Sequence, residues 1–259
     1  MKADRNFENL VAIVKILRKE CPWDRKQTHE SIKDNLIEEA YEAVEAIDNE
    51  DFDELEKELG DVLLHVVFHS NMANETDRFN IGDVIYSIQE KLIRRHPHVF
   101  GDAVADDEQQ VAENWENIKL KEGKDSVLEG IPKQLPALIR AQRMQQKAGN
   151  VGFDWQHSPK GEQQVWDKLE EELQEFKETL EKGDQQKSRD EFGDLLFSLV
   201  NVGRFFDLNA EDSLRSTNKK FITRFQYIEQ SLKEENKNIA ETSLEEMDKY
   251  WEKAKSIEE

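Results

Sequence analysis

Acidic residues recur in this sequence at spacings that suit metal coordination. A first set is followed 133 residues later by a second set of the same types in the same order: Glu38, Glu39, Glu42, Glu58 and Asp61, then Glu171, Glu172, Glu175, Glu191 and Asp194. Residues three or four apart share one face of a helix. If the two helices of each set form an antiparallel hairpin, their carboxylates converge.

Converging carboxylates repel one another unless a cation lies among them, and ligands that are all oxygen suit magnesium or manganese. In a chain with 57 Asp and Glu, a solvated acidic face is the ordinary alternative. The exact recurrence of the set and the apolar residues interleaved with it favour a metal site. We expect these ligands: Glu172, Glu175, Glu191 and Asp194 in the second repeat, and Glu39, Glu42, Glu58 and Asp61 in the first.

Cations and an aromatic ring recur after each acidic set. Lysine and arginine lie four apart in both repeats, and so do tryptophan and lysine: Lys91 and Arg95, Trp115 and Lys119, then Lys220 and Arg224, Trp251 and Lys255. Metal ions bridge the oxygens of a nucleoside triphosphate, Lys and Arg neutralise its phosphates, and a ring can line its base or sugar. The combination therefore predicts a triphosphate site.

The two repeats differ in charge beside their acids. Lys168 and Lys187 each precede an acidic pair of the second repeat by one helical turn, whereas Asn35 and Glu54 stand at the matching positions of the first. A triphosphate is strongly anionic, so added positive charge favours its binding. We expect the second repeat to be the stronger catalytic site and the first to be weaker, differently selective or mainly structural.

The periodicity of apolar residues predicts an all-α fold made of two tandem helical bundles. We expect a first domain at 1–122, a linker at 123–136, where Gly130, Pro132 and Pro136 interrupt the pattern, and a second domain at 137–259. The expected helices are 7–20, 31–47, 52–73, 81–95, 111–121, 137–148, 162–181, 185–206, 210–235 and 243–256. A polar loop is expected after His96-Pro97-His98.

Composition excludes several functional classes. The net charge of −21 argues against a nucleic-acid polymer as partner, since such binding needs a basic footprint. Cys21 is the only cysteine, which excludes an internal disulfide and a cysteine metal cluster. No apolar run approaches the length that spans a membrane, and the N-terminus has no apolar signal segment. We therefore expect a cytoplasmic protein that does not enter membranes.

The sequence resembles the MazG nucleoside triphosphate pyrophosphohydrolases over nearly its whole length. The resemblance rests on the repeated Glu-Glu-x-x-Glu and Glu-x-x-Asp motifs and on the strings CPWD, LIEEAYE, ELGDVL, RRHPHVFGD, RAQRMQQKA, NVGFDW and EFGDLLFSLVN. It implies an all-α nucleoside triphosphate pyrophosphatase fold related to the dimeric dUTPases, a homodimer and magnesium dependence. It also implies cleavage of ribo- or deoxyribonucleoside triphosphates to a monophosphate and pyrophosphate, and a role in removing unwanted nucleotides or in stress. The metal ligands that it implies are those given above.

The substrate contacts that the resemblance implies are Lys168, Lys187, Lys220, Arg224 and Trp251, and the recurrence of a lysine after each tryptophan adds Lys255. For the mechanism we expect magnesium-assisted hydrolysis, with Glu171 accepting a proton from water and Glu172 holding the metal. Lys220 and Arg224 would offset phosphate charge. Trp251 reads no precise base edge, which predicts broad base tolerance.

Two other functions compete with this one. A di-iron carboxylate bundle also gathers acids on helices, but it requires a Glu-x-x-His motif that neither repeat has. A non-catalytic helical dimer that binds partner proteins through its acidic surface is the second alternative. His65, His69, His96 and His98 are expected to be structural.

Overall fold

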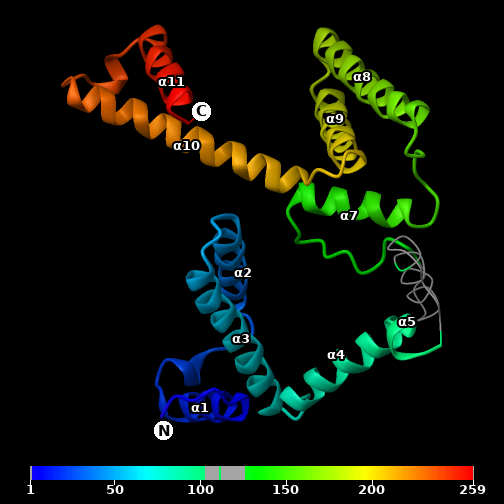
Figure 1. The fold of residues 1–259 in the computed structure, drawn as a ribbon, viewed down its shortest axis with the longest axis vertical. Coiled ribbons are helices and arrows are strands. Elements are labelled where there is room, and N and C mark those ends of the chain that lie inside the picture. The colour runs from blue at the N-terminus through cyan, green and yellow to red at the C-terminus, as the bar shows by residue number, and fades with distance from the viewer. Residues whose placement is uncertain (1, 103–110, 112–125, 259) are drawn as a thin grey trace. The chain divides into compact units, whose positions relative to one another are not determined.

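Helices joined by turns and loops make up the part of the chain that a computed structural model describes, residues 2–102, 111 and 126–258 (Figure 1). No β-strand occurs in these residues, so the predicted all-α fold is confirmed. The chain divides into two compact units, Met1–Val104 and Ala105–Glu259. Residues 112–121 of the expected helix at 111–121 and much of the expected domain boundary fall outside the described residues. The limits 1–122, 123–136 and 137–259 therefore stay a prediction.

The first unit is built around a hairpin of two long helices. Its elements are α1 (Phe7–Glu20), η1 (Asp24–Lys26), α2 (Lys33–Asp48), α3 (Phe52–Asn74), α4 (Ile81–Arg95) and α5 (Pro97–Phe100). The side chain of Asp51 accepts a hydrogen bond from the backbone N–H of Glu54 and so caps the start of α3. A buried apolar cluster joins α1 to α3: Val14, Ile32, Val67, Phe68 and Met72. This cluster holds the hairpin against α1.

The chain after His96 differs from the expected loop. It forms the short helix α5, which Pro97 begins. Proline is tolerated at the first helical position because its missing N–H would have no partner there. His96 is thus the only residue between α4 and α5, and it caps the end of one helix and the start of the next.

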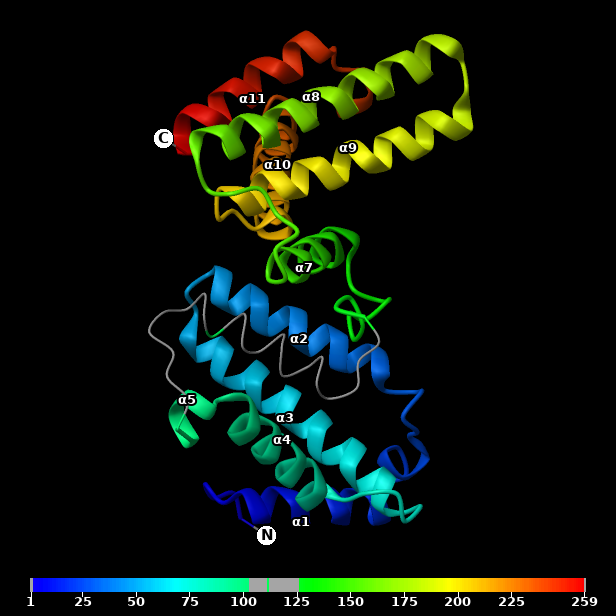
Figure 2. The same ribbon diagram turned by 90° about the vertical axis from the view of Figure 1, so that its right-hand side faces the viewer.

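The second unit repeats the hairpin. Its elements are α7 (Ala137–Gly149), α8 (Pro159–Lys182), α9 (Gln185–Phe205), α10 (Ala210–Glu234), η2 (Ile239–Glu241) and α11 (Leu244–Glu258). Gly183 ends α8 with φ 70°, a left-handed conformation that glycine adopts without strain. Asp184 then caps α9 by accepting from the N–H of Lys187. The tight turn makes α8 and α9 antiparallel neighbours (Figure 2).

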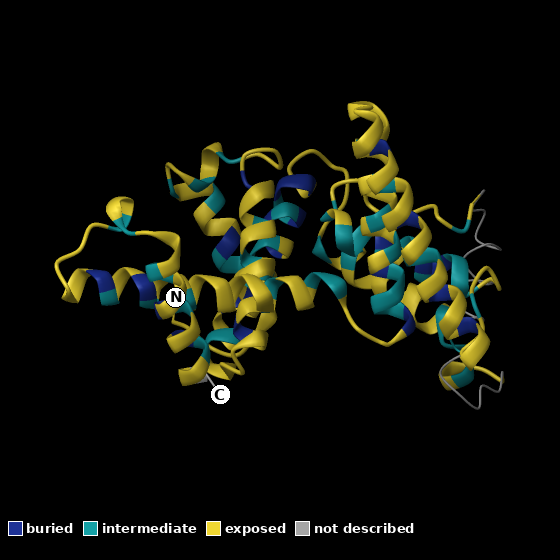
Figure 3. Ribbon diagram, turned by 90° about the horizontal axis from the view of Figure 1, so that it is seen from above, coloured by how far each residue is buried: buried dark blue, intermediate teal, exposed yellow. Residues whose placement is uncertain are grey.

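A second hairpin in this unit pairs α10 with α11. Its buried core consists of Ile228, Leu232 and Tyr250. Both units carry thin cores, and most of the surface of each helix is exposed (Figure 3). Within the described residues, no helix is both long and apolar enough to cross a membrane.

Candidate metal centre

The second acidic set converges where α8 faces α9. Glu172 and Glu175 lie one turn apart on α8, and Glu191 lies on α9. Each offers a carboxylate oxygen, and these three atoms all lie within 4.8 Å of one another. The hairpin and the helical spacing together bring these predicted ligands into one group.

Burial and mutual repulsion strain this group. Glu172 is buried, with 6% of its surface exposed. The pKa of Glu191 is raised, first by desolvation and then by the negative charges of Glu175, Asp194 and Glu172. A divalent cation would relieve this repulsion, and a donor set of carboxylate oxygens fits magnesium or manganese.

Asp194, the fourth predicted ligand, lies at the border of the group. It is not part of the closest oxygen set, but its charge contributes to the raised pKa of Glu191. It also lines the adjoining cavity described below. Asp194 therefore interacts with the acidic group and also lines that cavity.

A lysine of the same helix neutralises part of the acidic group. Lys168 Nζ lies 2.6 Å from Glu172 Oε1 and 3.1 Å from Glu171 Oε1. The hydrogen bond to Glu172 is the largest cause that raises the pKa of Lys168. Of the two lysines expected beside the acids, Lys168 is thus part of the centre. Lys187 is exposed in the first turn of α9.

The first acidic set converges in the same way on α2 and α3. Oxygens of Glu39, Glu58 and Asp61 lie within 4.8 Å of one another. Desolvation, the charge of Glu42 and a hydrogen bond with Glu42 raise the pKa of Glu58 to about 7. The pKa of Glu39 is also raised, by desolvation first and then by Asp61 and Glu42. All four predicted ligands of this repeat therefore interact with at least one other.

The two acidic centres differ in the charges beside them, and the second is the more positive, as the sequence predicts. Glu54, at the position of Lys187, forms an ion pair with Lys57 and adds to the raised pKa of Glu58. Asn35, at the position of Lys168, is exposed. The second centre therefore has a cation within hydrogen-bonding distance of its buried carboxylate, where the first has a neutral amide.

The remaining predicted substrate residues lie on the α10–α11 hairpin. Arg224 Cζ lies 5.5 Å from the centre of the Trp251 ring. Phe221 packs on the same ring at 5.3 Å. Lys220 is exposed one turn before Arg224, and Lys255 pairs with Glu252 at 3.0 Å. All four predicted residues lie on a different hairpin from the acids, and two of them, Arg224 and Trp251, are in contact. The first-repeat counterparts Trp115 and Lys119 lie outside the described residues.

An apolar cavity adjoins the second centre, and sequence reasoning missed it. Its volume is about 600 Å³. It is bounded by α7, α8, α9 and two loops, with these lining residues: Leu128, Met144, Gln145, Ala148, Phe153, Asp154, Trp155, Lys168, Glu172, Asp194, Phe197, Ser198, Asn201 and Arg204. The string Gly-Phe-Asp-Trp at 152–155 was the available signal, since aromatic side chains beside a glycine often line binding loops.

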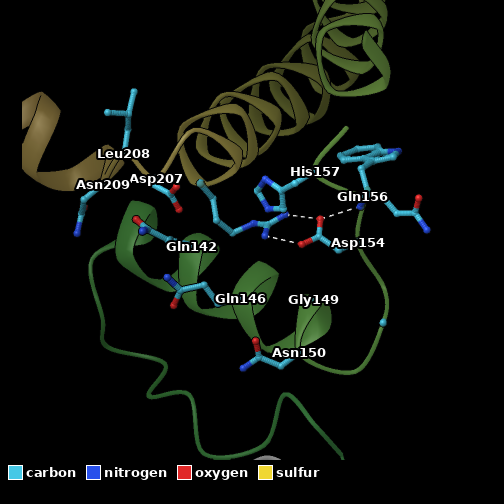
Figure 4. A pocket seen from close by; sticks show the side chains of 13 residues that line it. Gln142, Gln146, Gly149, Asn150, Asp154, Gln156, His157, Asp207, Leu208 and Asn209 are labelled. Atoms are coloured by element: carbon cyan, nitrogen blue, oxygen red, sulfur yellow. Dashed lines mark hydrogen bonds and ion pairs between the residues drawn. The ribbon is translucent and has the colours of Figure 1, made fainter. Parts of the chain in front are cut away.

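A second, polar cavity of about 850 Å³ shares lining residues with the first, and Figure 4 draws the side chains that line it. The carboxylate of Asp154 accepts two hydrogen bonds of 2.6 Å from the guanidinium of Arg204. Both residues line both cavities. In Figure 4, Gln142 and Gln146 project from α7 toward this cavity. The bidentate pair therefore fixes the loop after α7 against α9.

The histidines are not members of the close acidic sets, although the charge of His65 acts on Glu39 and opposes the rise of its pKa. His29 Nδ1 lies 2.7 Å from His69 Nδ1, and the two rings stack. Within the described residues, neither close acidic set includes a histidine. Both donor sets are thus all oxygen.

Two segments of the chain match a known protein family, and each segment contains one of the two acidic hairpins. Residues 27–100 and 160–228 each match the MazG nucleotide pyrophosphohydrolase domain. The chain is 48% identical to the nucleoside triphosphate pyrophosphohydrolase/pyrophosphatase MazG of Thermotoga maritima, over 98% of this chain and 97% of that protein. It is 40% identical to a nucleoside triphosphate pyrophosphohydrolase of Escherichia coli K12, over 97% and 98%. It is also 47% identical to the uncharacterized protein YabN of Bacillus subtilis, of which it covers 52%.

Proposed function

Because the chain belongs to the MazG family of nucleotide pyrophosphohydrolases, we propose that its second acidic centre cleaves nucleoside triphosphates between the α and β phosphates. The products are a nucleoside monophosphate and pyrophosphate. Relatives that align over nearly the whole chain are named as enzymes of this class. The single observation that carries the assignment to this centre is the convergence of Glu172, Glu175 and Glu191 within 4.8 Å.

The proposed metal is magnesium, with manganese as a substitute. Glu172, Glu175, Glu191 and Asp194 would hold it in the second repeat, and Glu39, Glu42, Glu58 and Asp61 in the first. When bound, magnesium polarises phosphate oxygens and lowers the pKa of a bound water. This proposal is supported by the all-oxygen donor set and by the raised pKa of Glu191 that a cation would reverse.

The residues of the chain supply the rest of the proposed reaction. Glu171, exposed one residue before Glu172, accepts a proton as water attacks the α phosphorus and the bond to pyrophosphate breaks. With Glu172 serving as a ligand of the metal, Lys168 would be free to turn to the phosphates. Lys168, Lys187, Lys220, Arg224 and Lys255 then offset the charge that develops on the leaving group.

The proposal also includes a homodimer. Large apolar side chains on the α8–α9 hairpin are exposed, among them Phe192, Leu196 and Leu199. Exposed apolar surface of this kind favours contact with another protein surface. Because Lys220, Arg224 and Trp251 lie on the α10–α11 hairpin, closure of that hairpin over an acidic centre, within one chain or between two, would bring them to the substrate. Trp251 would then line the sugar.

The second repeat is proposed as the main site and the first as the weaker one, because only the second pairs a lysine with its buried glutamate. Broad base tolerance, a role in clearing unwanted nucleotides and a cytoplasmic location complete the proposal. Nucleoside triphosphates are the proposed partners, and nucleic-acid polymers and membranes are not.

One assay tests the proposal. The full chain is incubated with a mixed pool of nucleoside triphosphates and magnesium, and pyrophosphate and monophosphates are measured. Equal amounts of the two products are expected, and their release should stop in Glu172→Gln and when the magnesium is chelated. Release of single phosphate, or no turnover, would contradict it. An absence of turnover would favour the alternative function, a non-catalytic helical dimer that binds partner proteins through its acidic surface.

A further inference from the structure

We propose that the first repeat holds a second kind of metal site, in which His29, His65 and His69 bind a divalent transition metal such as zinc. The site is separate from the carboxylate centre of the same repeat and does not depend on the proposed hydrolytic function. It departs from the structural role that the sequence alone suggests for His65 and His69.

The three histidines come from two segments of the first unit that meet. His65 and His69 lie one turn apart on α3, so they share one face of that helix. His29 lies in the loop between η1 and α2, and its Nδ1 is 2.7 Å from Nδ1 of His69. Two histidines four apart on a helix, joined by a third ligand from another segment, are a recurrent way to bind zinc.

The separations of the rings suit a shared ion. The ring centres of His29 and His69 are 5.0 Å apart, and those of His65 and His69 are 6.2 Å apart. Because imidazole nitrogens bind zinc at about 2.1 Å, two rings on one ion have centres roughly 4.5 to 6.5 Å apart. Both separations lie in this range, so rotation of the side chains is enough to bring the three rings to one ion.

The contact between His29 and His69 directs two lone pairs at one place. In an N–H···N hydrogen bond one nitrogen donates and the other accepts, so the proton lies where both lone pairs point. An ion that displaces this proton needs about 3 Å between the two nitrogens, and the exposed side chain of His29 can move that far. Burial first, and then the charges of His29 and His65, lower the pKa of His69. His69 is therefore neutral at neutral pH, as a ligand must be.

The hydrogen bonds of the protein do not engage every nitrogen of the two helical histidines. His65 Nδ1 and His69 Nε2 are buried and have no hydrogen-bond partner among the described residues. Most buried polar atoms are paired, so these two rings are held less firmly than is usual. The contact between His29 and His69 lies at the surface, so an ion can enter there.

The loop that carries His29 is ordered by its own hydrogen bonds. The backbone N–H of Thr28 donates to Oγ of Ser31 at 2.9 Å, and the N–H of Ser31 donates to Oγ1 of Thr28 at 3.1 Å. Arg18 of α1 donates to the main-chain carbonyl of Gln27 at 3.1 Å. These bonds place His29 beside α3 before an ion binds, which reduces the entropy lost on binding.

The histidine site and the carboxylate centre of the first repeat favour different ions. His65 follows Asp61 by one turn of α3, and its charge acts on Glu39. Magnesium takes oxygen ligands and keeps much of its water, whereas imidazole suits zinc, cobalt, nickel and copper. Saturating magnesium can therefore occupy the carboxylates while a transition metal binds the histidines.

The second repeat does not share this site. Glu162, Ser198 and Val202 stand 133 residues after the three histidines, and none of them has an imidazole. The site is therefore a feature of the first repeat alone. An ion bound there would tie the loop before α2 to α3 and so stabilise the first unit.

The first test is calorimetric titration of the full chain with zinc in saturating magnesium. We expect the wild type to bind a single zinc ion, and His29→Ala and His69→Ala each to weaken its affinity roughly a hundredfold or more, since loss of a residue that only orients a ligand already costs ten- to a hundredfold. His29 is exposed, so its replacement should not disturb folding. His98→Ala is the matched control, because the rings of His96 and His98 lie a similar 5.6 Å apart. It should bind zinc as the wild type does.

The second test identifies the ligands. Cobalt(II) in place of zinc gives a visible spectrum that depends on its ligands and geometry. A site of nitrogen ligands with low coordination number should give strong bands, which should disappear in His29→Ala and remain in His98→Ala. The melting temperature should rise with zinc in the wild type and in His98→Ala, and should not rise in His29→Ala.

Three results would overturn the histidine site. The first is no zinc binding by the wild type, and the second is equal binding by the wild type and both variants, His29→Ala and His69→Ala. The third is loss of zinc on addition of magnesium, which would place the zinc at the carboxylates as an adventitious ion only. None of these readouts uses triphosphate hydrolysis, so failure of the proposed function would be seen separately.

Discussion

Lys168 Nζ lies 2.6 Å from Glu172 Oε1, four residues further along α8, so a lysine is paired with a carboxylate that the proposed metal would use. The pair stabilises a glutamate that is 6% exposed. A buried carboxylate that loses its partner is strongly unfavourable. Lysine and metal are therefore alternatives as counter-ions of Glu172.

The first prediction follows from this exchange. Lys168→Met should lower the melting temperature of protein kept in a chelator, and saturating magnesium should restore most of the loss because the cation replaces the lysine. Differential scanning calorimetry with and without magnesium measures it. Lys182→Met removes a lysine of the same helix from an exposed pair with Glu178. It should change the melting temperature little, either with or without magnesium. An equal loss in both variants would argue against the exchange.

Removal of a metal ligand is the second prediction. Glu172→Gln or Asp194→Asn should lower kcat at saturating magnesium by roughly a hundredfold or more, since even residues that only orient ligands are worth ten- to a hundredfold. Initial rates of pyrophosphate release measure the effect. Glu170→Gln changes an exposed acid of the same helix and should retain normal turnover. Near-normal rates in Glu172→Gln would remove this centre from the mechanism.

The third prediction compares the two repeats in the full chain. Glu39→Gln should leave most of the turnover, whereas Glu172→Gln should abolish it. The second centre has a lysine at its buried glutamate and adjoins an apolar cavity of about 600 Å³, whereas the cavity beside the first centre is smaller, at about 310 Å³, and lined mainly by acids. Steady-state rates of the two variants for several triphosphates, measured side by side, decide which repeat is the main site. The reverse order would assign catalysis to the first repeat.

A pH dependence gives the fourth prediction. Arg18 donates to Glu75 at 2.9 and 2.7 Å, and this hydrogen bond lowers the pKa of Glu75. The contribution of this ion pair to stability is present above the normal pKa of a glutamate. It is lost as pH falls through the lowered pKa of Glu75 in the folded protein. Glu75→Gln should therefore cost less than about 1 kcal/mol at neutral pH, since Glu75 is partly exposed, and nothing in strong acid.

Urea unfolding at several pH values tests this dependence. Glu20→Gln is the control, because Glu20 forms only an exposed contact of 3.7 Å with Lys19. It should leave stability unchanged across the same range. A difference between Glu75→Gln and wild type that does not shrink in acid would contradict the ion pair as the cause.

Local sequence signals predicted the helices well because caps mark their ends. α1 and α4 have the expected bounds, and Asp51 and Asp184 cap the helices that carry Glu58 and Glu191. The small errors arise at termini, where α8 begins at Pro159 rather than Glu162. Convergence of the acids was also predictable, because it depends on helical spacing and one hairpin turn.

The cavity could not be predicted in the same way. Its walls come from separate segments, and the contact between Arg204 and Asp154 joins residues that are fifty positions apart in the sequence. Gln145 gives no signal in a one-dimensional pattern, since its unpaired oxygen is a property of how α7 packs on α9. Packing decides these features, and spacing alone does not encode packing.

Lys147 has a practical consequence for dissecting the protein. It is 5% exposed, and its Nζ donates to the carbonyls of Val127 at 2.7 Å and Glu129 at 3.2 Å. These bonds hold Leu128 in the wall of the cavity. A fragment cut at Ala137 would therefore lose part of its own binding wall, and a separately produced C-terminal half should start upstream of Ser126.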